Sequence, residues 1–225
     1  SSDLSLGAVR QGRPAASYGA AAAVSFNGNK IMTTSGGGAF LTDDAEQADR
    51  VRYLATQARQ PVVHYEHTDV GYNYRMSNLL AAMGRTQLGR LDEMMERRRR
   101  LRLHYEELFS NVPGVRIFGE PSSVDGGATH DNFWLTSVIV EPRRAGFTAE
   151  DLRLALAAAN IEARPLWKPM HLQPVYAGAR AFVDGTSERL FRTGLSLPSG
   201  SVLKRPDVDR IDSVVRGFME HVHAA

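Results

Sequence analysis

The sequence Ser-Phe-Asn-Gly-Asn-Lys at residues 25–30 is followed at once by Ile-Met-Thr-Thr-Ser-Gly-Gly-Gly at residues 31–38. An apolar run at residues 20–24 precedes it and reads as a strand, so one lysine stands between a strand end and three glycines. A strand end holds a side chain more precisely than a loop does, and glycines permit backbone angles and close approaches that other residues do not. A lysine that forms a Schiff base requires these surroundings.

Lysine is rare in this chain: Lys30, Lys168 and Lys204 are the only lysines among 27 lysine and arginine residues. Arginine stays protonated, whereas a desolvated lysine can lose its proton and attack a carbonyl carbon. An amine at position 30 of an arginine-rich chain therefore indicates a chemical role. A phosphate-binding P-loop fails on spacing, because Asn29 stands where that motif has glycine and Ile31 where it has serine or threonine.

Beyond the glycines, residues 40–42 read as a short return strand. Thr42 or Asp43 is expected to cap a helix over residues 44–58, because a hydroxyl or carboxylate satisfies the first backbone N–H groups of a helix. Apolar residues at helical spacing then predict one long helix over residues 76–110.

A second group of elements follows the long helix. Strands are expected at residues 114–118 and 134–140, with a Gly- and Ser-rich loop at 121–129 between them. Thr148 begins a capping-box pattern with Asp151. The elements expected after it are a helix at residues 149–160, a strand at 161–164 and an amphipathic helix at 207–222.

The composition is that of a globular protein with one large or two small domains: 225 residues, 43% hydrophobic and 23% charged. The sequence contains no apolar run of the roughly 18 residues that a transmembrane helix needs, and its start lacks a signal-peptide pattern. Zero cysteines exclude disulfides and cysteine metal sites, which favours a cytoplasmic location.

The formal net charge of +2 is too small to indicate nucleic-acid binding by itself. The four arginines at residues 97–100 are the local exception, but successive helical residues point about 100° apart, so they form no single strip. Acidic residues flank the run on both sides. We expect a solvated helix face or interface salt bridges here, and no nucleic acid.

The residues His64, Glu66 and His67 lie in a predicted loop at residues 61–69 and are of the types that bind metals. No further ligand follows at a useful spacing, so no metal is predicted. His64 is kept as a weak substrate-side candidate.

Four blocks, taken in order, resemble the DegT/DnrJ/EryC1/StrS sugar aminotransferases. The blocks are Ser-Phe-x-x-x-Lys with its Gly-Gly-Gly at residues 25–38, Gly-Tyr-Asn-Tyr-Arg-Met-Ser-Asn at 71–78, Arg-Pro-Leu-Trp-Lys-Pro-Met-His at 164–171 and Leu-Pro-Ser-Gly at 197–200. The resemblance covers the chain from Gly7 onward. It implies an α/β fold, aminotransferase fold type I, with pyridoxal 5'-phosphate as cofactor.

By this resemblance Lys30 is the catalytic residue that binds the cofactor covalently and later carries a proton. Ser25 would bind the cofactor phosphate through its hydroxyl, and Asn73 would reach the phosphate of the neighbouring subunit's cofactor, since the family builds its sites across a homodimer interface. A hydroxyl and an amide donate to phosphate oxygens without adding charge beside the lysine.

The substrate-binding candidates implied by the resemblance are His171, Tyr176, Lys168 and Arg75. A lysine binds a diphosphate as a point charge. Weaker candidates of the same kind are His130, Asn132 and Trp134.

The family carries a phosphate-binding loop, a stacking aromatic residue and a Glu-Asp pair before its lysine, and nothing in residues 1–24 corresponds to them. We therefore expect the chain to be the C-terminal portion of a longer enzyme. Residues 1–90 would be the end of the large cofactor-binding domain with the start of a linking helix, and residues 91–225 the small C-terminal α/β domain.

The resemblance implies transfer of an amino group from L-glutamate to a nucleotide-linked 4-keto-6-deoxy sugar, for surface glycan or amino sugar synthesis. The alternatives are a truncated or non-catalytic descendant that acts as a dimerisation module, and a basic nucleic-acid-binding module. An aminotransferase for amino acids or aminocyclitols remains possible within the same fold. A sugar dehydratase is disfavoured, because those members carry histidine in place of the lysine.

Overall fold

The computed structural model describes residues 5–119 and 128–224, and side chains up to residue 222. Most of the loop expected at residues 121–129 lies outside these ranges. The chain divides into two compact units, each described here by itself: residues 1–96 with 121–134, and residues 97–120 with 135–225. The predicted division into a cofactor-binding domain up to residue 90 and a small C-terminal domain from residue 91 stays a prediction.

The first unit contains two small antiparallel sheets. One has the strand order β2-β1-β6 and consists of β1 (Val9–Arg10), β2 (Arg13–Pro14) and β6 (Thr129–His130). The other is the hairpin of β3 (Ala21–Ser25) and β4 (Gly38–Thr42), in which Ser25 pairs with Gly38. The predicted strand before the lysine and its return strand are therefore confirmed. A 3₁₀ turn, η1 (Ala15–Ser17), precedes β3.

Helix α1 (Ala45–Ala55) follows β4, as expected, but its bounds differ from those predicted. Its cap is Asp44, whose Oδ1 accepts the Glu46 N–H at 2.9 Å, so the prediction of Thr42 or Asp43 is wrong. Thr42 instead accepts the Asp44 N–H at 3.1 Å. Either oxygen is a suitable acceptor by type, and only the path of the chain leaving β4 decides between them.

The predicted long helix is two helices, α2 (Asn78–Leu88) and α3 (Leu91–Phe109). Ser77 caps α2, and the break falls at Gly89 and Arg90. Glycine is a poor helix former, and apolar spacing continues across the break, so periodicity alone predicted one element.

The second unit is built around a four-stranded antiparallel sheet of order β5-β7-β9-β8. Its strands are β5 (Val115–Ile117), β7 (Thr136–Val140), β8 (Arg164–Pro165) and β9 (Gly194–Leu197). The strand expected at residues 161–164 shrinks to Arg164–Pro165. Every residue of β7 is buried, as a central strand requires.

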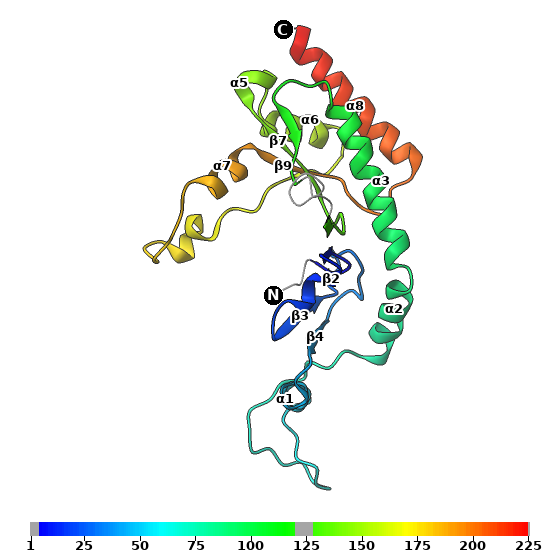
Figure 1. Ribbon diagram of the computed structural model, residues 1–225, viewed down its shortest axis with the longest axis vertical. Helices are drawn as coiled ribbons and strands as arrows, with labels where there is room; N and C mark the ends of the chain where they lie inside the picture. Colours follow the sequence, from blue (N-terminus) through cyan, green and yellow to red (C-terminus); the bar gives the residue numbers. More distant parts are fainter. Residues whose placement is uncertain (1–4, 120–127, 225) are drawn as a thin grey trace. The chain divides into compact units, whose positions relative to one another are not determined.

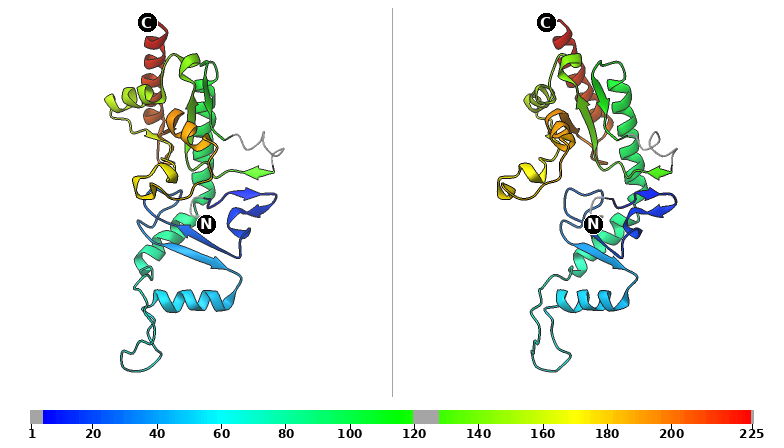
Figure 2. Two further views of the ribbon diagram at one scale, coloured as in Figure 1. Left: turned by 90° about the vertical axis from the view of Figure 1, so that its left-hand side faces the viewer. Right: turned by 60° about the vertical axis from the view of Figure 1, so that its left-hand side comes forward.

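Helices α3 and α8 (Arg205–Ala224) lie side by side in this unit (Figures 1 and 2), joined by the His104 Nε2 and Asp212 Oδ1 atoms at 2.8 Å. The unit also contains α5 (Pro142–Ala145), α6 (Ala149–Ala158), α7 (Thr186–Thr193) and the 3₁₀ turns η2 (Met170–Leu172) and η3 (Pro174–Tyr176). A single apolar core joins sheet and helices, and its fully buried side chains include Tyr105, Val138, Leu152, Leu156 and Val215. Each buried aliphatic side chain contributes roughly 1.5–3 kcal/mol to folding.

The arginine run on α3 is not simply a solvated face. Arg98 is 8% exposed and Arg102 is 3% exposed. Arg98 donates to the Ser199 carbonyl at 2.7 Å, and Arg102 forms an ion pair with Glu106 at 2.8 Å. Because these two guanidinium groups turn inward, the predicted solvated face consists of the exposed Arg97, Arg99 and Arg100 alone.

The capping box predicted at Thr148 is present and begins α6. The Thr148 hydroxyl oxygen accepts the Asp151 N–H at 3.1 Å, while the Asp151 carboxylate accepts the Thr148 N–H at 2.8 Å. Bonds from the Thr148 backbone and side chain hold the pKa of the Asp151 carboxyl below its ordinary value.

Thr148→Ala is expected to lower the free energy of unfolding by about 1 kcal/mol, since it removes one of the two reciprocal caps. Because the folded pKa of Asp151 is lowered, its stabilisation is present above about pH 4 and is lost as pH falls through the folded pKa. Asp151→Asn should therefore flatten the acid side of the stability profile. Urea unfolding followed by circular dichroism at several pH values measures both effects.

The control is Ser213→Ala, an exposed position within α8, for which we expect a change within about 0.5 kcal/mol. If Thr148→Ala costs no more than this control, the capping box does not stabilise α6.

Within the described ranges, no helix combines the length and apolar character needed to cross a membrane.

Candidate active site

The loop joining β3 to β4 is tied down by backbone hydrogen bonds at both ends. The Phe26 N–H donates to the Gly37 carbonyl at 3.0 Å, and the Thr34 N–H donates to the Phe26 carbonyl at 2.9 Å. Within the loop, the Lys30 N–H donates to the Asn27 carbonyl at 3.0 Å and closes a tight turn. The backbone of the predicted catalytic lysine is therefore fixed by its own hairpin.

The Lys30 side chain is half-buried and lies against Trp134. Its Nζ is 4.9 Å from the centroid of the Trp134 ring, a distance at which an ammonium group is attracted by the aromatic face. The indole N–H of the same tryptophan donates to the Asn29 carbonyl at 2.8 Å. Trp134 thus holds both the turn and the amine, whereas sequence reasoning named it only as a weak substrate candidate.

We expect Trp134→Phe to keep an aromatic face for Lys30 while losing the bond to Asn29, and Trp134→Ala to lose both. The measurement is the rate at which pyridoxal phosphate labels Lys30 covalently, with the product trapped by borohydride. A single neutral hydrogen bond contributes about 1 kcal/mol, so this rate should fall about fivefold in Trp134→Phe. It should fall further in Trp134→Ala, which also loses the aromatic face.

Trp167→Phe is the matched control, because Trp167 is the second of the chain's two tryptophans and is 66% exposed in the other unit. Equal labelling rates in Trp134→Ala and in this control would show that Trp134 does not position the lysine.

Ser25, the predicted phosphate ligand, is the last residue of β3 and is half-buried. Its Oγ accepts the Asn27 N–H at 3.4 Å, a long bond. Ser25 therefore stands at the strand end from which the pinned loop of Lys30 begins.

Asn73 and Arg75 lie in the same unit but on an exposed segment. Asn73 pairs with Thr56 in an isolated β-bridge, and the rings of Tyr72 and Tyr74 stack with centroids 5.0 Å apart and an interplanar angle of 11°. The backbone at Asn73 is therefore anchored next to α1, while the residue itself is exposed to solvent.

The other substrate candidates belong to the second unit. The His171 Nε2 lies 3.0 Å from Glu188 Oε1, and both side chains are partly buried. Lys168 and Tyr176 are exposed on the same segment, which extends away from the sheet (Figure 1). Glu188 was not among the residues predicted from the sequence. Its only signal there is the hydrophilic pattern at the start of α7.

The remaining candidates have structural roles or are exposed. The buried Asn132 donates to the Leu6 carbonyl at 2.9 Å and so fixes the chain there. His130 is exposed in β6. His64 lies 3.3 Å from Glu66 on an exposed loop. Among the described residues, no three metal-ligating side chains come together.

Most of the chain matches a known protein family. A model of the DegT/DnrJ/EryC1/StrS aminotransferase family aligns with residues 4–216. The chain belongs to this family, whose cofactor is pyridoxal phosphate, and the sequence prediction of the family is confirmed.

Curated relatives agree with this assignment. EpsN of Bacillus subtilis (strain 168), whose name describes a pyridoxal phosphate-dependent aminotransferase, is 40% identical over 94% of this chain and 53% of its own length. The GDP-perosamine synthase of Caulobacter vibrioides is 34% identical over 92% of this chain and 54% of its own length. The chain therefore spans about half the length of these relatives.

Solved structures show the same fold. The aminotransferase TlmJ from Streptoalloteichus hindustanus superposes with a TM-score of 0.84 at 25% identity, covering 96% of this chain and 56% of that one. A DegT/DnrJ/EryC1/StrS aminotransferase from Brucella abortus superposes with a TM-score of 0.79 at 29% identity, covering 97% and 56%. The predicted α/β fold, aminotransferase fold type I, is confirmed.

The residues around Lys30 fit pyridoxal phosphate. The lysine is half-buried and its backbone is pinned, which is what an amine needs to react repeatedly with one aldehyde carbon. The Ser25 hydroxyl stands at the strand end of the same loop as a donor for phosphate. A Cβ at position 36 would meet no atom within 4 Å, so there is space beside the loop at Gly36.

Proposed function

We propose that this chain carries the catalytic lysine and part of the substrate site of a pyridoxal phosphate-dependent sugar aminotransferase. The reaction would transfer an amino group from L-glutamate to a 4-keto-6-deoxy sugar linked to a nucleoside diphosphate. The observation that carries the proposal is Lys30, the lysine of the family motif, held half-buried in a pinned loop against Trp134. A cytoplasmic location belongs to the same proposal.

Lys30 would hold the cofactor covalently through Nζ, and Ser25 would bind its phosphate. When bound, pyridoxal phosphate supplies an electron sink that stabilises negative charge on the reacting carbon. Lys30, once released by the amino donor, would carry a proton on Nζ from the substrate carbon toward the cofactor. The aromatic face of Trp134 would keep that ammonium group near its site of action.

The relatives support a nucleotide sugar as substrate. They include a dTDP-3-amino-3,4,6-trideoxy-alpha-D-glucose transaminase from Streptomyces venezuelae, 33% identical over 97% of this chain and 55% of its own length. Their names differ in both nucleotide and sugar, so we extend to this chain only the substrate class. Lys168, His171 and Tyr176 are proposed to contact the sugar and the diphosphate, with Arg75 as a further contact.

We propose further that the working form is a homodimer in which Asn73 reaches the partner's cofactor phosphate. The segment between α1 and α2 extends away from the hairpin of its own unit (Figure 2). It also exposes large apolar side chains. These are Val63, 100% exposed, with Tyr65, Val70 and Tyr74, each 76–80% exposed. Apolar groups of this extent mark an interaction surface, and this one flanks Asn73.

The non-catalytic alternative predicts the same surface but no reactive lysine. To separate the two, the chain is incubated with pyridoxal phosphate, reduced with borohydride and digested, and the modified peptide is identified by mass spectrometry. We expect one pyridoxyl group on Lys30. Absence of label, or label spread evenly over Lys30, Lys168 and Lys204, would contradict the proposal.

A further inference from the structure

The exposed arginines of α3 are not used by the proposed reaction, and two of them line a cavity. A cavity of about 440 Å³ lies between α3 and the start of α8, entirely within the second unit. Five of its lining residues are basic: Arg97, Arg100 and His104 from α3, and Lys204 and Arg205 from the entry to α8. None of the described residues that line it is acidic.

The helix geometry explains why two of the four consecutive arginines meet here. Residues three and four apart share one face of a helix, so Arg97, Arg100 and His104 form a stripe. Arg98 points into the core instead, toward the Ser199 carbonyl. The burial of Arg98 thereby fixes the rotation of α3 and turns Arg97 and Arg100 toward α8.

Three carboxylates of α8 near the cavity have partners of their own. Asp209 forms an ion pair with Arg205 at 2.7 Å, and Asp212 lies 2.8 Å from His104. The Asp207 carboxylate accepts the backbone N–H of Lys204 at 2.8 Å. Bringing several like charges together costs Coulomb energy that an anion in the cavity would offset.

The floor of the cavity is apolar, with Leu101, Leu203 and Val208 among its lining residues. A volume of about 440 Å³ falls in the range of small-molecule sites, roughly 300–1,000 Å³. Each guanidinium has five N–H donors in a planar fork and can bind phosphate oxygens in a bidentate manner, which suits Arg97 and Arg100 to a phosphate group.

We propose that this cavity binds a small phosphorylated molecule with two or more phosphate groups, whose phosphates meet the basic residues and whose remainder lies on the apolar floor. The site shares no residue with Lys30, Ser25 or the segment containing Lys168 and His171. The proposal therefore rests on none of the residues of the proposed sugar aminotransferase site.

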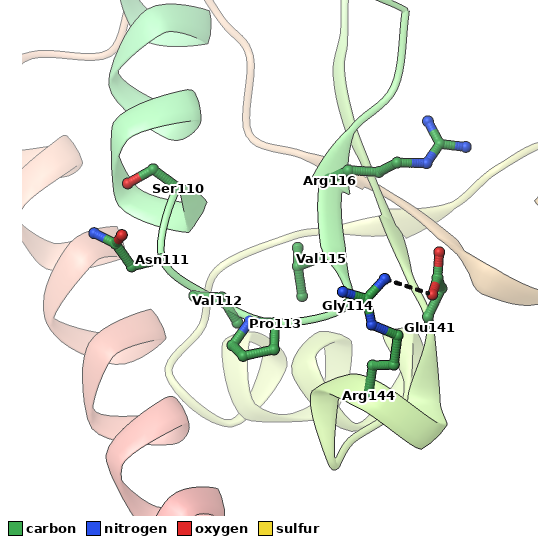
Figure 3. A pocket seen from close by; sticks show the side chains of 9 residues that line it. All are labelled: Ser110, Asn111, Val112, Pro113, Gly114, Val115, Arg116, Glu141 and Arg144. Atoms are coloured by element: carbon green, nitrogen blue, oxygen red, sulfur yellow. Dashed lines mark hydrogen bonds and ion pairs between the residues drawn. The ribbon is translucent and has the colours of Figure 1, made fainter.

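A second cavity of about 410 Å³ in the same unit shows the contrast (Figure 3). It lies between the end of α3, β5 and the start of α5. There Arg144 faces Glu141 at 3.4 Å, while the Arg116 side chain points away from that pair. Because an acidic residue lines this cavity, we propose no anion site in it.

Inorganic pyrophosphate is the probe for the proposed site, titrated into the full chain by isothermal titration calorimetry. We expect saturable binding of one molecule per chain. Removing one charge-assisted contact weakens binding by about tenfold, so the double variant Arg100→Gln with Lys204→Gln should raise the Kd by at least tenfold. Circular dichroism checks that this variant is folded.

Two double variants test whether pyrophosphate binds in the cavity rather than elsewhere on the chain. Arg116→Gln with Arg143→Gln removes the same charge from exposed positions outside the cavity and should change the Kd by less than about twofold. Ser25→Ala with Lys168→Gln should likewise leave the Kd unchanged, which separates this site from the cofactor and sugar sites.

Three results would overturn the proposal. One is the absence of pyrophosphate binding by the unaltered chain. Another is equal weakening by the cavity variant and either control, which would show general electrostatic attraction or binding elsewhere. The third is displacement of pyrophosphate by a short DNA duplex with a steep salt dependence, because this would assign the basic face to nucleic acid.

Discussion

Lys30→Arg is expected to abolish covalent labelling of the chain by pyridoxal phosphate. The substitution keeps the positive charge beside Trp134, but a guanidinium does not lose its proton and cannot attack the aldehyde carbon. The loss of a covalent catalytic group and proton carrier should lower transamination with L-glutamate by at least about a thousandfold. Mass spectrometry after borohydride reduction measures the label, and absorbance of the cofactor follows the half-reaction.

The chain's own lysines supply the controls, since Lys168 and Lys204 are the only others. Lys168→Ala and Lys204→Ala should each retain the label on position 30. Because Lys30 is at a turn outside the cores, its arginine variant should unfold at the same urea concentration as the unaltered chain. Label retained by Lys30→Arg would show that another group is the nucleophile.

Gly38→Ala is expected to disrupt the hairpin that carries Lys30. A Cβ at this position would lie 2.4 Å from the Val24 carbonyl oxygen, which is closer than non-bonded contact allows. Because the obstructing atom belongs to the backbone, β3 and β4 must separate or shift, and Ser25 pairs directly with Gly38. We expect a loss of at least about 2 kcal/mol in stability together with loss of labelling at Lys30.

Gly36→Ala is the matched control two residues away in the same triple glycine. A Cβ there meets nothing within 4 Å, and its φ is not in the left-handed region, so stability should change by less than about 1 kcal/mol. Hydrogen exchange of the β3 and β4 amides compares the two variants. Equal protection in both would mean that the hairpin does not need glycine at position 38.

Helices and strands could be predicted where a short residue pattern is typical of only one local structure. The capping box at Thr148 requires only two residues three apart, and it formed as expected. The strand ending at Ser25 and its return strand followed from an apolar run and a glycine turn. The helix break at Gly89 was not predicted, because apolar periodicity continues through it and only the packing of each helix separates them.

The sequence by itself determined the family. The family motif and the scarcity of lysine single out Lys30 as the proposed catalytic residue. The sequence could not show that Trp134, far away in the chain, lies over that amine, or that Glu188 pairs with His171. Nor could it decide which arginines of a continuous run turn inward. Those outcomes depend on contacts between segments that are distant in the sequence. The type of a side chain does not decide whether it faces solvent or a partner, so only tertiary packing determines which contacts form.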